Sequence, residues 1–136
     1  MSNLTKQNVR TIVAATDLSP ASKIAVEQAA LLAKQFGAEL VLLHVFNDGF
    51  WSTIKAIYSA EHWMDTEPVL VARTLLSQQV EEIAKRHGIR VRGDTRTGRA
   101  AREINTFGHE QDAQLIVVGE HGEDWIGDAV IGGTAL

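Results

Sequence analysis

The first residue that could do chemistry is an acidic residue at the end of an apolar run. Asp17 lies in the segment TDLSPAS, one or two residues past the run VRTIVAA. A carboxylate at this point can accept hydrogen bonds from the hydroxyls of a sugar, or it can cap the helix that follows it. The position of Asp17 leaves both roles open.

The second candidate is a glycine-rich segment that follows another apolar run, LIVV at 115–118. It begins with Gly119-Glu-His-Gly122 and continues through Gly127 to Gly132 and Gly133. Glycines let backbone N–H groups approach a phosphate closely, and the N-terminus of a following helix adds a favourable field. Two glycines three residues apart also fit a flexible loop, so the segment is a candidate phosphate loop with that plainer alternative.

Other chemistries lack the residues they need. The chain has no cysteine, which excludes disulfides, thiolate zinc sites and cysteine nucleophiles. It has no G-x-G-x-x-G after the first apolar run, no G-x-x-x-x-G-K-[ST], no H-E-x-x-H and no evident acid/base pair of carboxylates. The five histidines are scattered, and we expect His44 and His87 to be structural, whereas His121 lies in the glycine-rich segment. We therefore predict no catalytic residues and no protein-built metal site.

The candidate residues need elements to position them, and the apolar pattern predicts those elements. Continuous runs predict strands covered on both faces, and a weaker alternating run predicts a strand nearer a sheet edge. Apolar residues at helical spacing predict helices, the first two capped by Gly37 and Gly88. The predicted strands are 9–15, 39–46, 89–95 (the edge strand) and 115–118, and the predicted helices are 20–36, 68–87 and 99–110.

Strands that alternate with helices predict an α/β domain with a parallel sheet. In such a sheet, ligands bind beyond the carboxyl ends of the strands. The loop after Ala15, the loop from Asn47 onward and the loop Gly119–Gly133 all leave such ends, so they are expected to meet. The length of 136 residues is that of one domain.

Composition narrows the setting and the partners. The chain has 13 Lys and Arg against 17 Asp and Glu, a net charge of −4, so it lacks the basic footprint of a nucleic-acid-binding protein. No apolar run approaches the ~18 residues of a membrane span, and the N-terminus has no apolar signal core. We expect a cytoplasmic protein with neither a nucleic-acid nor a membrane partner.

The ordered set of motifs resembles the universal stress protein family. These motifs are IVAATDLSPAS, then LVLLHVF one helix later, then the turn at Gly98, then DAQLIVVGEHG with glycines downstream. The likeness covers about Val9 to Ala135. It implies an open twisted, mostly parallel sheet of the Rossmann-like type with helices on both faces, and usually a homodimer. Family domains continue with a helix and a strand after the GGT-like segment, so the single domain 1–136 is expected to lack these two elements.

One branch of the family binds ATP through the pattern G-x2-G-x9-G-[ST], and another branch lacks both the pattern and the binding. Gly119, Gly122 and Gly132 match its glycines, whereas Gly133 stands at the hydroxyl position and Thr134 follows one place later. Acidic residues also crowd this segment, and they oppose a triphosphate unless an ion such as Mg²⁺ screens them. They are Glu120, Glu123, Asp124 and Asp128.

The resemblance also implies roles for single residues. Asp17 would bind the ribose, with Thr16 in the same loop, and Ala15 and Val45 would lie near the adenine. The backbone N–H groups of four glycines would line the phosphates, and the Thr134 hydroxyl would face the terminal phosphates. The four glycines are Gly119, Gly122, Gly132 and Gly133.

We interpret the chain as a stress-response protein that binds ATP or a related adenine nucleotide. No candidate base is poised over a phosphate, so at most weak ATP hydrolysis is expected. The alternative is a family member that does not bind nucleotides and acts through dimerisation or partner contacts. Gly133 and the acidic segment favour it. An aromatic cluster also favours it if its side chains are exposed rather than covering the sheet or a dimer core; its members are Phe50, Trp51, Tyr58 and Trp63. An enzyme such as a nucleotide hydrolase or a phosphorelay receiver is a third class, but a receiver's acidic cluster and late-strand lysine are not apparent.

Overall fold

Strands and helices alternate along residues 8–47 and 67–119, which are the residues that the computed structural model describes. The elements are β1 (Thr11–Ala15), α1 (Ser22–Phe36), β2 (Glu39–Phe46), α3 (Glu67–His87), β3 (Val91–Thr97), α4 (Ala100–Glu110) and β4 (Leu115–Val117).

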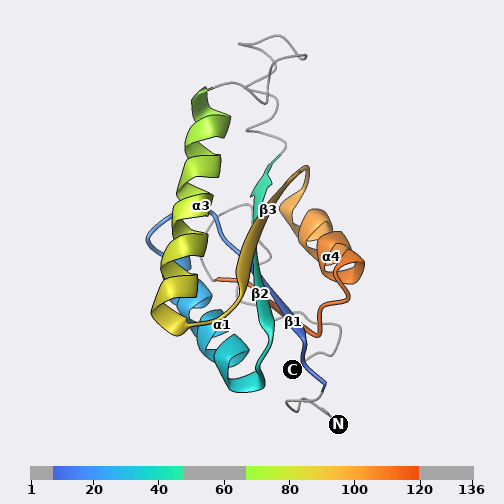
Figure 1. Ribbon diagram of the computed structural model, residues 1–136. Coiled ribbons are helices and arrows are strands. Elements are labelled where there is room, and N and C mark those ends of the chain that lie inside the picture. Colours follow the sequence, from blue (N-terminus) through green and yellow to red (C-terminus); the bar gives the residue numbers. More distant parts are fainter. Residues whose placement is uncertain (1–7, 48–66, 120–136) are drawn as a thin grey trace.

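The strands form a parallel sheet in the order β3-β2-β1-β4. Val13 of β1 lies between Val41 of β2 and Ile116 of β4. Helices α1 and α3 cover one face of the sheet and α4 covers the other (Figure 1). The predicted α/β architecture is therefore confirmed, and the carboxyl ends of all the described strands point to the same edge.

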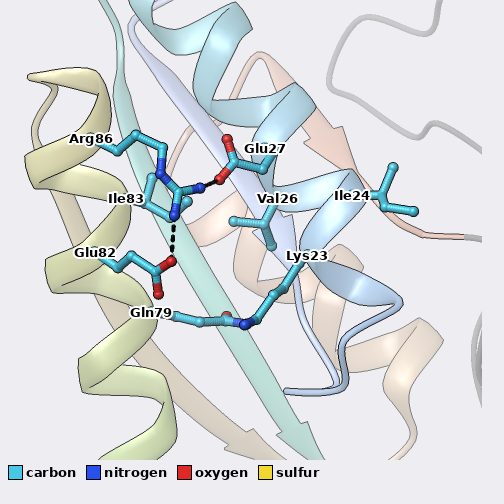
Figure 2. Close-up of a pocket in the computed structure, with 8 residues that line it drawn as sticks. All are labelled: Lys23, Ile24, Val26, Glu27, Gln79, Glu82, Ile83 and Arg86. Atoms are coloured by element: carbon cyan, nitrogen blue, oxygen red, sulfur yellow. Dashed lines mark hydrogen bonds and ion pairs between the residues drawn. The ribbon is translucent and has the colours of Figure 1, made fainter.

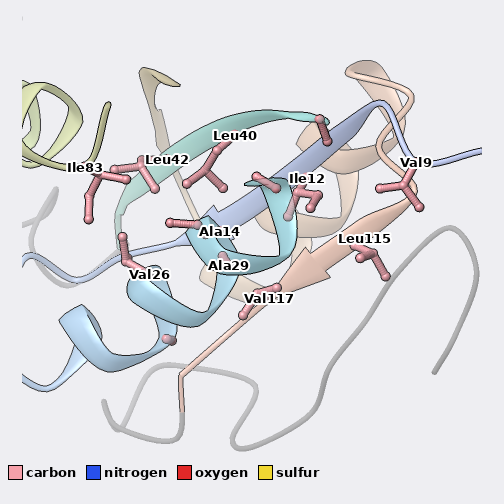
Figure 3. Close-up of a cluster of buried hydrophobic side chains, with 14 of the residues drawn as sticks. Val9, Ile12, Ala14, Val26, Ala29, Leu40, Leu42, Ile83, Leu115 and Val117 are labelled. Atoms are coloured by element: carbon pink, nitrogen blue, oxygen red, sulfur yellow. The ribbon is translucent and has the colours of Figure 1, made fainter. Parts of the chain in front are cut away.

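Alternate side chains of β1, β2 and β4 enter two separate cores. One core lies under α1 and α3 and includes Ile12, Leu40 and Leu115 (Figure 3). The other lies under α4 and includes Val13, Leu43 and Ile116. Because both faces are buried, β1, β2 and β4 read as continuous apolar runs rather than as alternating ones.

Four predicted boundaries were wrong by two residues: the start of the first strand, which is Thr11 rather than Val9, the start of the first helix, and both ends of the edge strand. The first helix begins at Ser22 rather than at Pro20, because Pro20 forms a turn in which its carbonyl accepts a hydrogen bond from the Lys23 N–H at 3.2 Å. The edge strand runs from Val91 to Thr97 rather than from 89 to 95, because it pairs with β2 as far as Phe46. A backbone ladder of this kind extends a strand into polar residues that the apolar pattern excludes.

The predicted helix ends are confirmed at the two glycine caps. Gly37 and Gly88 have φ values of 68° and 64°, in the left-handed region that ends a helix. The N–H of Gly37 donates to the Lys34 carbonyl, and that of Gly88 donates to the Ala84 carbonyl. Each of these glycines therefore ends a helix, and the chain then returns to the sheet.

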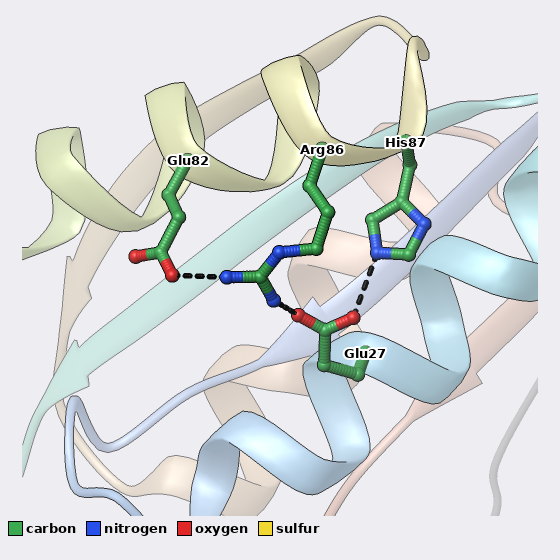
Figure 4. Close-up of polar contacts among 4 residues, drawn as sticks. All are labelled: Glu27, Glu82, Arg86 and His87. Atoms are coloured by element: carbon green, nitrogen blue, oxygen red, sulfur yellow. Dashed lines mark hydrogen bonds and ion pairs between the residues drawn. The ribbon is translucent and has the colours of Figure 1, made fainter.

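Charged side chains link α1 to the end of α3 (Figure 4). Arg86 forms ion pairs with Glu27 of α1 and with Glu82, one turn earlier on α3. His87 Nε2 lies 2.7 Å from the other carboxylate oxygen of Glu27. His87 therefore has an internal partner, as predicted for a structural histidine.

Candidate functional site

Asp17 lies in the loop between β1 and α1, at the carboxyl edge of the sheet. Its Oδ1 accepts hydrogen bonds from the Ser19 N–H at 2.9 Å and from the Ser19 hydroxyl at 2.5 Å. The Ser19 Oγ in turn accepts a hydrogen bond from the Ser22 N–H at 3.3 Å, at the start of α1. Ser19 thus caps the helix directly, and Asp17 braces the loop. A carboxylate offers about four acceptor sites on two oxygens, so Asp17 keeps capacity for a ligand hydroxyl.

The charge of Asp17 is fixed by the same contacts. Burial alone would raise the pKa of Asp17, but hydrogen bonds from the side chain and backbone of Ser19 outweigh it and lower the pKa below its usual value. The carboxylate is therefore ionised at neutral pH and acts only as an acceptor. A low pKa also makes it a poor general base, because a base works best with a pKa near the operating pH.

The loop that carries Asp17 is strained and strongly held. Leu18 has a φ of 67°, a left-handed conformation that costs a branched residue about 1–3 kcal/mol. Its N–H donates to the Thr16 hydroxyl at 3.0 Å, and its side chain packs against the core under α1 and α3. Strain of this kind persists only where the surroundings over-determine the backbone, so the loop is preorganised before any ligand arrives.

Gly119 follows β4 at the same edge of the sheet, near the start of α1. The pairing of Ala14 with Val117 places the ends of β1 and β4 side by side. A Cβ added at Gly119 would lie 3.5 Å from the Cβ of Ala25, near the start of α1. Asp17 and Gly119, which are 102 positions apart in the sequence, therefore lie at one edge of the sheet.

The two residues predicted to lie near the adenine are buried. Ala15 and Val45 belong to the core under α4, with exposed fractions of 1% and 7%. Both residues are therefore almost entirely covered in this structure, backbone included. Four predicted site residues lie outside the described residues: Gly122, Gly132, Gly133 and Thr134. The acidic segment and the aromatic residues between 50 and 63 lie outside them as well.

His44 supports the loop from β2. Its Nδ1 lies 2.9 Å from the Thr16 carbonyl oxygen, which can only accept, so Nδ1 carries the proton. Its ring packs edge-on against Phe46, with the ring centroids 4.8 Å apart. Burial lowers the pKa of His44, although the Thr16 carbonyl and the Asp17 charge act in the opposite direction. The histidine is thus neutral and structural, as predicted.

This partly buried histidine predicts an acid-dependent loss of stability. Because its folded pKa lies below the unfolded value of 6.5, the unfolded chain takes up the proton first as the pH falls. The stability that His44 contributes above pH 6.5 is therefore lost as the pH falls below 6.5 toward the folded pKa. Urea unfolding at about pH 7.5 and about pH 5.5 should show a larger fall for the parent than for His44→Asn, which keeps an N–H donor but does not titrate. Equal falls in the two proteins would contradict the assignment.

A pocket of about 280 Å³ opens between α1 and α3, lined by residues such as Val26, Gln79 and Ile83 (Figure 2). The charged side chains at its rim form ion pairs with one another, Arg86 with Glu27 and with Glu82.

Within residues 8–47 and 67–119, no three His, Asp or Glu side chains gather to hold a metal ion. No helix in the same ranges is long and apolar enough to cross a membrane.

A parallel sheet with helices on both faces, and with a carboxylate and a glycine at its carboxyl edge, places the protein in the α/β class. A model of the universal stress protein family matches residues 8–136, so the chain belongs to that family. The resemblance seen in the sequence is thereby confirmed. None of the curated proteins compared with the chain matches it.

Solved structures of universal stress proteins share the fold. The protein UspA from Lactobacillus plantarum is 20% identical, with a TM-score of 0.70 over 91% of this chain and 83% of its own. A universal stress protein from Archaeoglobus fulgidus is 20% identical, with a TM-score of 0.64 over 87% of this chain and 80% of its own. A third universal stress protein, solved in complex with cAMP, is 22% identical, with a TM-score of 0.63 over 87% of this chain and 81% of its own.

Proposed function

We propose that this protein binds an adenine nucleotide, ATP or a related compound, at the carboxyl edge of the sheet and does not turn it over efficiently. The observation that carries the proposal is the ionised Asp17 carboxylate, held on a strained loop at the same sheet edge as Gly119. A ribose offers hydroxyl donors, and an ionised carboxylate with free acceptor capacity suits them. Family membership and a relative of the same fold in complex with cAMP support the adenine nucleotide.

Each candidate residue has a role in this nucleotide site. Asp17 binds the ribose, Thr16 shapes the loop, and Ala15 and Val45 lie near the adenine. The phosphates meet backbone N–H groups of the glycines and the hydroxyl of Thr134. The glycines are Gly119, Gly122, Gly132 and Gly133. The low pKa of Asp17 argues against its acting as the base of a hydrolase, so turnover is expected to be slow.

Titration calorimetry tests binding directly. ATP and cAMP should each be titrated into the protein, with and without Mg²⁺, because ATP carries the phosphates that the acidic segment opposes. We expect saturable binding of at least one of them. The absence of heat from both at millimolar nucleotide would refute the proposal.

The alternative is action through self-association or partner contacts. Three large apolar side chains are exposed on α3, with exposed fractions between 42% and 50%. They are Leu70, Val71 and Leu75. If neither nucleotide binds, this exposed surface favours the alternative, and sedimentation of the protein would show whether it forms the homodimer that we propose from the family.

A further inference from the structure

Thr16 is the point where the candidate nucleotide loop is tied to the rest of the protein. The residue is fully buried, and its N–H donates to the Leu43 carbonyl at 2.8 Å. Its carbonyl accepts the His44 Nδ1–H, and its hydroxyl accepts the Leu18 N–H. Its hydroxyl oxygen also lies 3.0 Å from that of the buried Ser22. The backbone at Leu18, next to Asp17, is therefore held in part by this hydroxyl.

Gln79 reaches this hydroxyl from the middle of α3. The Thr16 hydroxyl donates to Gln79 Oε1 at 3.1 Å, across 63 positions of sequence. Gln79 is 7% exposed and lies on α3 between the core residues Leu76 and Ile83. Burying an amide is unfavourable unless it is hydrogen-bonded, so this contact accounts for a glutamine at a position suited to an apolar residue.

The contact with Gln79 orients the Thr16 hydroxyl. A hydroxyl has one proton to donate and two lone pairs to accept with. When the proton goes to Gln79, the lone pairs remain for other donors, among them the Leu18 N–H. Without this acceptor, the hydroxyl can turn its proton toward the Ser22 oxygen, and its lone pairs turn with it, so the hydrogen bond from the Leu18 N–H is less well oriented. The strained conformation of Leu18 then loses part of its support.

We propose that Gln79 is a positioning residue for Asp17, and that it makes nucleotide affinity depend on the packing of α3. The proposal rests on the proposed adenine-nucleotide site. Gln79 also lines the pocket between α1 and α3, so it lies between that pocket and the loop (Figure 2). A displacement of α3 relative to α1 would move Gln79, change its hydrogen bond to Thr16 and so alter the position of Asp17.

The test compares Gln79→Met with Gln78→Met. Both changes remove a glutamine amide from α3 and keep the side-chain length, but Gln78 is exposed and Gln79 is buried. The probes are ATP and an analogue that lacks both ribose hydroxyls, dideoxy-ATP. Gln79→Met should weaken ATP binding about two- to tenfold, the range for losing one neutral hydrogen bond, and leave dideoxy-ATP binding unchanged. Gln78→Met should change neither.

A second pair of variants covers the case in which Gln79→Met fails to fold. Thr16→Val removes the hydroxyl at nearly constant volume, and Thr16→Ser keeps it. Thr16→Val should weaken ATP binding selectively, and Thr16→Ser, which keeps the hydroxyl, should weaken it less than Thr16→Val does. In the double variant, Gln79→Met should add little to Thr16→Val, because both remove the same bond. Equal losses for ATP and dideoxy-ATP, or strict additivity, would overturn the positioning role.

Hydrogen exchange in the absence of nucleotide separates failure of this proposal from failure of the proposed function. The amide protons of Leu18 and Ser19 should exchange faster in Gln79→Met than in the parent or in Gln78→Met. If the parent binds no nucleotide, the proposed function is wrong and the link to affinity falls with it. The exchange rates then still decide whether Gln79 orders the loop, and unchanged rates would refute that.

Discussion

Replacing Phe107 by alanine is expected to lower the free energy of unfolding by about 3–5 kcal/mol, the usual cost of removing a buried phenyl ring. Phe107 is fully buried and stands first by volume among the fully buried side chains of the described residues. It belongs to the core under α4, together with Ile104 and Ile116. The guanidinium of Arg96 also lies 4.8 Å from its ring centroid, a contact that alanine loses as well. α4 has few other large apolar side chains that pack against the sheet.

Denaturant unfolding of matched variants measures this effect. Phe36→Ala removes the same side chain from the end of α1, where it is only partly buried, and should cost clearly less. Phe107→Leu is a milder change for use if the alanine variant is unfolded, because whole domains are stable by only about 5–15 kcal/mol. A cost for Phe107→Ala no greater than that for Phe36→Ala would show that α4 does not pack on the sheet as described.

The architecture was predictable because burial on both faces leaves a clear record in the sequence. The run ELVLLHVF predicted the bounds of β2, since the side chains from 40 to 43 enter the two cores alternately and Val45 enters the core under α4. The left-handed caps at Gly37 and Gly88 were predictable for a similar reason, because few other residues adopt that conformation cheaply. Local chemistry alone determines these features.

The interior of the candidate site was less predictable. Asp17 and Gly119 could be brought to one edge by strand order alone, since parallel strands end together. The bond from Thr16 to Gln79 could not, because a glutamine on an amphipathic helix suggests an exposed position and its partner lies 63 positions away. The helical stripe of α3 through Leu76 and Ile83 left Gln79 beside it, and that proximity to the core was the available signal.

The left-handed Leu18 was equally hidden. Leucine carries no preference for positive φ, and the conformation follows from contacts that Thr16 and the core supply. The end of β3 has the same origin, because its polar residues are in a strand only through pairing with β2. Features determined by long-range partners leave weak marks in the local sequence.

Asp17→Ala is expected to weaken ATP binding by about 10- to 150-fold. A hydrogen bond to a charged group is worth about 1.5–3 kcal/mol, and each 1.4 kcal/mol is about a factor of ten in affinity. The part of the loss that belongs to the ribose contact is absent with dideoxy-ATP, so Asp17→Ala should weaken dideoxy-ATP binding clearly less than ATP binding. Titration calorimetry with both compounds therefore measures the loss and assigns it to the sugar hydroxyls.

Asp17→Asn separates the ligand contact from the bracing of the loop. The asparagine Oδ1 can still accept the hydrogen bonds from Ser19, but Nδ2 replaces the oxygen that would face the ligand and it cannot accept a hydroxyl proton. If Asp17 binds the ribose, Asp17→Asn should lose most of the preference for ATP over dideoxy-ATP, although its loop is held. If Asp17 serves the loop alone, Asp17→Asn should bind ATP as tightly as the parent and only Asp17→Ala should be impaired. That second outcome would remove the ribose role from Asp17, because the bracing of the loop would then account for the whole effect.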